Sequence, residues 1–168
     1  FTIIGIPAAE FPALPRLSDA TQITLPANLL KSMIRQTLFA VAESDAKPIH
    51  QGSLFNLEQG MLDVVSVDGY RLAVRSEPVD YPDELSFVVP GKTLGEILKL
   101  LKDTDDPVEL AAGRRHILFT IDNYTVISSL LEGEFLNYKA AIPPESQTEV
   151  ILKTREAIDS VERVSLLI

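Results

Sequence analysis

Two stretches of the sequence decide the fold: residues 22–38, QITLPANLLKSMIRQTL, and residues 86–102, SFVVPGKTLGEILKLLK. Each begins with a short strand-forming run, reaches a proline that suits the first turn of a helix, and continues with apolar residues at helical spacing. The strand–helix junctions follow Leu25 and Val89, and a similar junction follows Leu152. The spacing is therefore 64 and then 63 residues, which indicates an internal repeat.

The repeat predicts an α+β protein in which each unit is a strand, a helix and then three or four antiparallel strands. The apolar faces of the helices superpose, because Leu30, Leu94 and Ala157 occupy equivalent positions. Repeats of this length are typical of arrays or rings of like units. The alternative is a generic α+β domain with several helices.

The remaining elements follow from short runs of strand-forming residues separated by turn residues. We expect helices over 27–41 and 91–102 and after Lys153. Tight turns are expected at Asp68-Gly69, Gly113-Arg114 and Asp122-Asn123. The other predicted strands cover residues 1–6, 49–57, 61–67, 70–77, 85–89, 108–112, 115–121, 124–130 and 150–152.

Composition limits the class of protein. The 168 residues carry a net charge of −9 and no cysteine, which excludes disulfide frameworks, thiolate metal sites and cysteine nucleophiles. No apolar run approaches the roughly 18 residues of a membrane span, and the N-terminus lacks the pattern of a signal peptide. Taken alone, the acidic balance argues against a nucleic-acid binder. The chain starts at Phe1 and ends within an apolar helical pattern, so we expect a piece of a longer protein.

The sequence offers no constellation of residues for catalysis. His50 and His116 lack ligand-like partners at helical or hairpin spacing, and the acidic loop at 103–106 lacks the glycine and the terminal glutamate of a calcium loop. Phosphate-binding glycine loops and nucleophile elbows are also missing. We therefore expect no catalytic residue, metal or cofactor. An α+β enzyme with a scattered or missing active site stays open as an alternative.

Basic residues collect on the two predicted helices despite the acidic total. Lys31 and Arg35 share one helix face, and Lys92, Lys99 and Lys102 share a face of the second helix. These faces are either ordinary solvated surfaces or weak, sequence-independent contacts with phosphates.

Four collinear segments resemble one family. Residues 66–74, SVDGYRLAV, resemble the hairpin signature of the bacterial sliding clamp, the beta subunit of DNA polymerase III. Residues 8–15, AAEFPALP, resemble the end of its first domain, and 87–92, FVVPGK, resemble the entry to a middle-domain helix. Residues 132–138, EGEFLNY, resemble its DGRFPDY segment.

The resemblance implies a clamp fold with helices on one face and sheets on the other. It implies that 1–15 end domain one, 16–21 connect, 22–144 form the complete middle domain and 145–168 begin domain three. In this family a head-to-tail homodimer closes a ring around duplex DNA, slides along it and serves as a non-catalytic processivity factor. The two helices would line the hole, with their basic residues facing DNA: Lys31, Arg35, Lys92, Lys99 and Lys102.

The family also docks short linear motifs of the polymerase III catalytic subunit, the clamp loader and repair polymerases in an apolar groove. The groove residues implied here are His50, Val67, Gly69, Tyr70, Arg71, Leu72, Leu136, Tyr138, Ala140 and Ala141. His50, Leu136 and Ala140 depart from the usual family residues. The resemblance further implies a cytoplasmic, nucleoid-associated bacterial protein without membrane contact. It would be a homodimer at full length and largely a monomer as this stretch. A peptide-binding scaffold without a DNA role is the remaining alternative.

Overall fold

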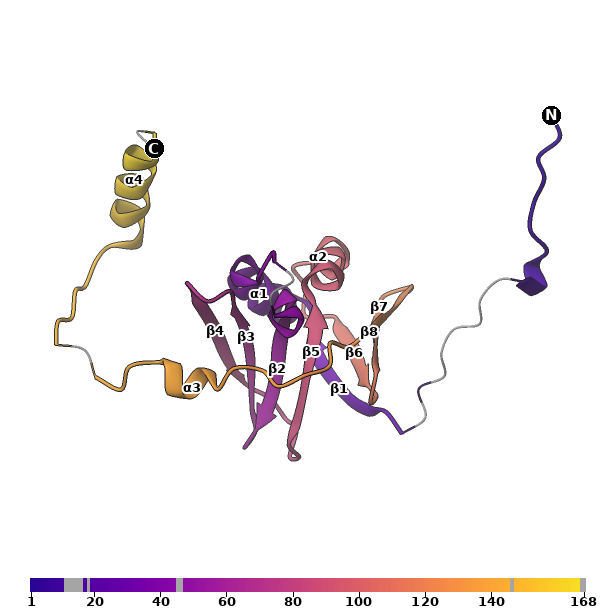
Figure 1. The fold of residues 1–168 in the computed structure, drawn as a ribbon, viewed down its shortest axis with the longest axis horizontal. Coiled ribbons are helices and arrows are strands. Elements are labelled where there is room, and N and C mark those ends of the chain that lie inside the picture. The colour runs from indigo at the N-terminus through magenta and orange to yellow at the C-terminus, as the bar shows by residue number, and fades with distance from the viewer. Residues whose placement is uncertain (11–16, 18, 45–46, 146, 167–168) are drawn as a thin grey trace. The chain divides into compact units, whose positions relative to one another are not determined.

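The computed structural model describes residues 1–10, 17, 19–44, 47–145 and 147–166 (Figure 1). They divide into two compact units, Phe1–Leu136 and Asn137–Ile168. The first unit contains eight strands and two longer helices among its described residues, and the second contains α3 (Tyr138–Ala141) and α4 (Thr154–Ser165).

The first unit is built on two four-stranded antiparallel sheets (Figure 1). One sheet has the order β1 (Thr21–Pro26), β6 (Pro107–Ala112), β7 (His116–Ile121) and β8 (Tyr124–Ser129). The other has the order β4 (Leu72–Pro78), β3 (Met61–Val67), β2 (Gly52–Glu58) and β5 (Leu85–Pro90). The two sheets meet where the backbone N–H of Leu131 donates to the Val88 carbonyl oxygen at 2.9 Å.

Two helices lie against each other on these sheets, α1 (Ala27–Thr37) and α2 (Gly91–Leu100), as Figure 1 shows. Each begins directly after a strand-ending proline with extended backbone, ψ 140° at Pro26 and 136° at Pro90. Proline suits this position because its missing N–H would lack a helical partner anyway. The predicted helices are confirmed with shorter ends. The first ends in a 3₁₀ turn, η2 (Leu38–Ala40), instead of continuing to residue 41. The second ends at Leu100, because Leu101 has extended backbone, so Lys102 follows the helix and does not lie on its face as predicted.

The helix stripes enter one hydrophobic core shared by both sheets. Leu30 and Leu94, which the repeat aligns, are both fully buried, and so are Phe55 of β2 and Phe119 of β7. Full burial of a leucine or phenylalanine side chain stabilises by about 1.5–3 kcal/mol. The helical apolar pattern is therefore the seam that joins the two sheets into one unit.

The first two sequence repeats are confirmed, and the structure shows that they exchange a strand. Each repeat is a strand, a helix and three strands: β1-α1-β2-β3-β4 and β5-α2-β6-β7-β8. The first strand of each repeat pairs with the meander of the other, β1 with β6 and β5 with β2. The registers correspond, with Pro26 opposite Pro107 and Pro90 opposite Gly52. Neither repeat can therefore complete its sheet without the other.

Several expected elements differ from the structure. Residues 1–6 and 150–152 form no strand, because a strand needs a neighbouring strand for its backbone hydrogen bonds. Their apolar side chains are exposed. At the third strand–helix junction, after Leu152, the structure therefore has the predicted helix, α4, but not the predicted strand. In addition, β2 begins at Gly52, because residues 48–51 form a 3₁₀ turn, η3 (Pro48–Gln51).

The turns are confirmed in part. Asp122-Asn123 is a two-residue turn, since Ile121 pairs with Tyr124 and Asp122 has φ 50°. Asp68-Gly69 belongs instead to a four-residue loop, because Val67 pairs with Leu72. At the N-terminus Ala8–Glu10 form a 3₁₀ turn, and the rest of the 8–15 segment lies outside the described residues. Within the described part of the chain, every helix is too short or too polar to cross a membrane.

Candidate functional site

One end of the second sheet gathers the sequence-predicted groove residues of the first unit. Because the strands are antiparallel, the start of β2, the end of β3 and the start of β4 lie at the same end of the sheet. Val67 and Leu72 are directly opposite each other in the register. Behind them the hydroxyl oxygens of Ser53 and Ser66 are 2.7 Å apart and fully buried. The sheet thereby fixes Val67 and Leu72 on neighbouring strands.

The loop that joins β3 to β4 is held by the carboxylate of Asp68. Its Oδ1 accepts from the backbone N–H groups of Tyr70 and Arg71, each at 3.0 Å, and its Oδ2 accepts from Arg71 Nε at 2.7 Å. The Arg71 side chain, followed by the Tyr70 and Arg71 backbone donors, lowers the pKa of Asp68. Gly69 has φ 90°, which favours glycine, and Tyr70 is 99% exposed. The loop therefore presents Tyr70 and Arg71 on a carboxylate-fixed backbone.

His50 lies buried beside an aromatic ring. Its imidazole and the Phe135 ring meet edge to face with centroids 5.3 Å apart, and its carbonyl accepts from the Ala42 N–H at 2.9 Å. Burial, and secondarily the charge of Lys47, lower the pKa of His50, which favours the neutral imidazole. Leu136, the residue after Phe135, is exposed. The structure thus brings His50 to the EGEFLNY segment, to which Leu136 belongs.

The other three predicted groove residues belong to the second unit. Tyr138, Ala140 and Ala141 lie in α3, a single helical turn in which the Ala140 N–H donates to Asn137 Oδ1 at 3.3 Å. Tyr138 is buried, and Ala140 and Ala141 are exposed.

Phe39 is a neighbour of these residues that sequence reasoning missed. It lies on η2, is 60% exposed, and its ring centroid is 5.9 Å from the guanidinium carbon of Arg71. This distance is within the range of a cation–π contact. The one available signal was its place outside the apolar stripe of the first helix, which left an aromatic residue without a core position.

The five predicted basic residues fall into two groups. Three form ion pairs: Lys31 with Asp103 at 2.8 Å, Lys99 with Glu96 at 2.7 Å and Lys102 with Asp122 at 2.6 Å. The hydrogen bond to Asp122, with its negative charge, raises the pKa of Lys102.

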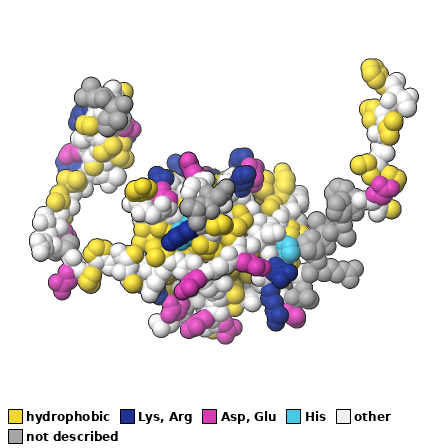
Figure 2. All heavy atoms as spheres, viewed as in Figure 1, with side chains coloured by type: hydrophobic (Ala, Val, Ile, Leu, Met, Phe, Trp, Pro, Cys, Tyr) yellow, Lys and Arg dark blue, Asp and Glu magenta, His cyan; other side chains and the backbone are white. Residues whose placement is uncertain are grey.

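Arg35 and Lys92 are exposed and have no ion-pair partner among the residues that the structure describes. Figure 2 shows Lys and Arg side chains mixed with acids over the two helices, while acidic side chains collect along the opposite edge. The available positive charge on the helices is therefore smaller than the five cations suggest.

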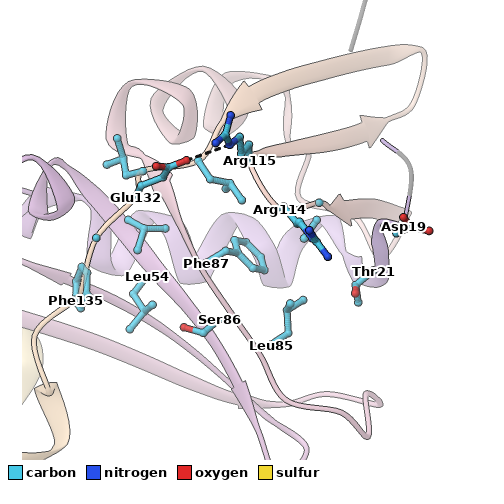
Figure 3. A pocket seen from close by; sticks show the side chains of 16 residues that line it. Asp19, Thr21, Leu54, Leu85, Ser86, Phe87, Arg114, Arg115, Glu132 and Phe135 are labelled. Carbon is cyan, nitrogen blue, oxygen red and sulfur yellow. Dashed lines mark ion pairs between the residues drawn. The ribbon is translucent and has the colours of Figure 1, made fainter. Parts of the chain in front are cut away.

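A separate cavity of about 600 Å³ lies between the sheets (Figure 3). Leu54, Leu85 and Phe87 contribute to its apolar lining, and Arg115 on its rim forms an ion pair with Glu132 at 3.5 Å. The lining includes none of the sequence-predicted site residues. No group of three or more His, Asp or Glu side chains that could hold a metal ion occurs among the described residues.

Comparison with known proteins identifies the fold. The solved sliding clamp of Bacillus subtilis superposes on 97% of the chain with a TM-score of 0.92 and 36% identity, over 43% of its own length. A putative DNA polymerase III beta subunit from Eubacterium rectale superposes on the whole chain with a TM-score of 0.93 and 36% identity, over 46% of its length. The fold is therefore the clamp fold.

Sequence comparison agrees. Residues 24–137 match the family described as DNA polymerase III beta subunit, central domain. The beta sliding clamp of B. subtilis is 37% identical over 169 aligned residues, which cover 99% of this chain and 45% of that protein. The chain belongs to the DNA polymerase III beta subunit family, and it spans just under half the length of these curated relatives.

Proposed function

We propose that the chain is the middle part of a sliding clamp, a non-catalytic processivity factor that encircles duplex DNA and tethers a polymerase. The observation that carries the proposal is the clamp fold, matched to the family's central domain over 24–137, with α1 and α2 side by side and cationic. On this proposal residues 1–15 end domain one, 16–21 connect, 22–144 form the middle domain and 145–168 begin domain three.

We further propose that α1 and α2 face DNA and that their cations, together with Lys102 just after α2, contact the phosphate backbone. Backbone contacts carry no sequence information, which suits a protein that must slide. Arg35 and Lys92 should contribute most, because the three lysines must exchange an existing carboxylate partner before they can bind a phosphate. Each phosphate contact contributes about 0.9 to the slope of log affinity against log salt concentration.

The test measures binding of the full-length clamp to a fluorescent duplex by anisotropy between low and moderate salt. Arg35→Gln combined with Lys92→Gln should lower the slope by about 1–2 per subunit. The matched control is Arg114→Gln with Arg115→Gln, which removes the same charge from the β6–β7 loop and should leave the slope unchanged. An equal loss in both double variants would mean that general charge, and not the helices, attracts DNA.

We also propose that the end of the second sheet where β3 joins β4 is part of a partner groove. Tyr138, Ala140 and Ala141 remain groove residues only by the family resemblance. The groove would take short linear motifs of the polymerase III catalytic subunit, the clamp loader and repair polymerases. Val67 and Leu72 are paired at the end of the sheet where β2 begins, and His50 lies in the 3₁₀ turn directly before β2, which supports the proposal. Apolar walls with a few fixed donors are typical of such sites.

For this groove, Leu72→Ala in the full-length clamp should abolish binding of a labelled motif peptide. Met61→Ala, at the opposite end of the same sheet, is the control, since Met61 pairs with Pro78 and not with the groove residues. Wild-type affinity in the Leu72 variant would place the groove elsewhere.

We propose that the full-length protein is a cytoplasmic, nucleoid-associated homodimer and that this stretch alone is a monomer. Analytical ultracentrifugation of both would test the oligomeric states.

A further inference from the structure

Arg71 is held from two sides by residues outside the predicted groove set. Its Nε donates to Asp68 Oδ2 at 2.7 Å, and its guanidinium lies over the ring of Phe39, 5.9 Å from the centroid. Among the described residues, no hydrogen bond engages its two terminal nitrogens. The side chain is about half exposed, so these donors are accessible to a ligand.

Asp68 is itself fixed before it holds Arg71. Its other carboxylate oxygen accepts two backbone N–H groups, from Tyr70 and Arg71, and its backbone N–H donates to the Arg71 carbonyl at 3.3 Å. The Asp68 side chain is only 16% exposed. The carboxylate is thus a rigid part of the loop, and the Nε contact transmits that rigidity to the guanidinium.

Phe39 is also supported from below. It belongs to η2, which contacts β3 and β4, and the adjoining residue Ala40 is fully buried. Thr37, just before η2, is buried and donates from its hydroxyl to the Met33 carbonyl at 2.9 Å. The exposed ring therefore stands on an anchored turn and presents a fixed face to Arg71.

We infer that Asp68 and Phe39 are positioning residues of the proposed groove, which hold Arg71 ready to donate to an acceptor oxygen of the partner motif. Arginine loses considerable side-chain freedom when it binds, and prior ordering removes that cost from the binding step. The inference rests on the proposed function, because Arg71 has this role only if a peptide occupies the groove.

The experiment uses the full-length clamp and a fluorescein-labelled peptide bearing the clamp-binding motif of the organism's replicative polymerase. Phe39→Leu keeps an apolar side chain without a ring face and should weaken binding about two- to fivefold, the size of an exposed cation–π contact. Phe39→Tyr restores a ring and should bind like wild type. Asp68→Asn keeps a side-chain oxygen that can accept from the Tyr70 and Arg71 N–H groups, but it loses the negative charge that faces Arg71 Nε. It should weaken binding to a similar extent.

The decisive comparison repeats these changes on Arg71→Met. If Asp68 and Phe39 act through Arg71, neither Phe39→Leu nor Asp68→Asn weakens binding further once the guanidinium is absent. Full additive losses would mean that Phe39 or Asp68 contacts the peptide directly, which would overturn the inference. Unchanged affinity in both single variants would overturn it as well.

Two controls separate this inference from the proposed function. If wild type binds the peptide and Leu72→Ala does not, the groove stands, and the Phe39 and Asp68 variants decide the inference alone. A wild-type clamp that binds no motif peptide refutes both. Thermal unfolding of each variant checks the fold, and if Asp68→Asn unfolds, the Phe39 pair of variants still decides.

Discussion

The buried hydroxyl pair at the groove end of the second sheet gives the sharpest test of the structure. Ser53 of β2 and Ser66 of β3 are both fully buried, and their oxygens are 2.7 Å apart. Neither side chain has another hydrogen bond among the described residues. Replacing one serine by alanine therefore leaves the other hydroxyl without its side-chain partner in the core.

The expected magnitudes follow from the asymmetry of buried hydrogen bonds. A buried polar group that loses its partner costs about 1–3 kcal/mol, whereas removing both partners can be nearly neutral. Ser53→Ala and Ser66→Ala should each lower the free energy of unfolding by about 1–3 kcal/mol. The double variant should cost no more than one single change, which corresponds to a coupling of about 1–3 kcal/mol.

The assay is urea unfolding of the wild type, the two single variants and the double variant, monitored by far-ultraviolet circular dichroism. The slope of free energy against urea should stay constant, so that the midpoints report stability directly. Additive losses in the double variant would show that the two hydroxyls do not interact. In that case the pairing of β2 with β3, which sets Leu54 opposite Val65 beside these two serines, would need revision.

Three further predictions concern single positions. A Cβ on Gly52 would lie 2.4 Å from the Val89 carbonyl oxygen, so Gly52→Ala should destabilise the protein by about 1–3 kcal/mol. Gly95 lies in α2 with open space around its Cβ position, so Gly95→Ala should stabilise the protein by about 0.5–1 kcal/mol. Urea midpoints that move in the same direction for both variants would contradict this prediction. Burial lowers the pKa of His50, so the unfolded chain binds the proton first and stability falls as the pH drops below about 6.5. His50→Leu should reduce that fall in unfolding free energy between pH 7.5 and 5.5, and an unchanged pH profile would exclude His50 as its source. The lowered pKa of Asp68 means that its carboxylate stabilises the folded protein above about pH 4 and that this effect is lost as the carboxylate is protonated. The difference in unfolding free energy between wild type and Asp68→Asn should therefore shrink toward pH 3. A constant difference would count against the Arg71 contact.

The sequence predicted the elements of the fold better than their partners. The helices after Pro26 and Pro90 were predictable because proline placement and apolar spacing are local signals. The pairing of β1 with β6 and of β5 with β2 was not, because a strand's composition does not specify its neighbour. The same reasoning explains residues 1–6 and 150–152, which have strand-forming side chains but no paired strand in the structure.

The candidate site was predictable only where it is contiguous. The segment from Val67 to Leu72 is a short hairpin motif, and its residues do lie together. Phe39 is 32 positions before Arg71 and reaches it only because η2 contacts β3 and β4. Asp68 was visible as a turn residue, but its hold on the Arg71 side chain depends on a four-residue loop, where the sequence predicted a two-residue turn.

The distribution of charge bears on the net charge of −9, which at first argued against DNA. On the proposed function the clamp must hold DNA by enclosure and still slide, so strong phosphate binding would be a disadvantage. The ion pairs of Lys31, Lys99 and Lys102 meet that requirement, because exposed pairs are worth only about 0–1 kcal/mol and can open as a phosphate passes. Each paired lysine then releases little net free energy on DNA. A mildly cationic pair of helices, moderated by its own acids, would thus favour a weak and mobile contact over a fixed one.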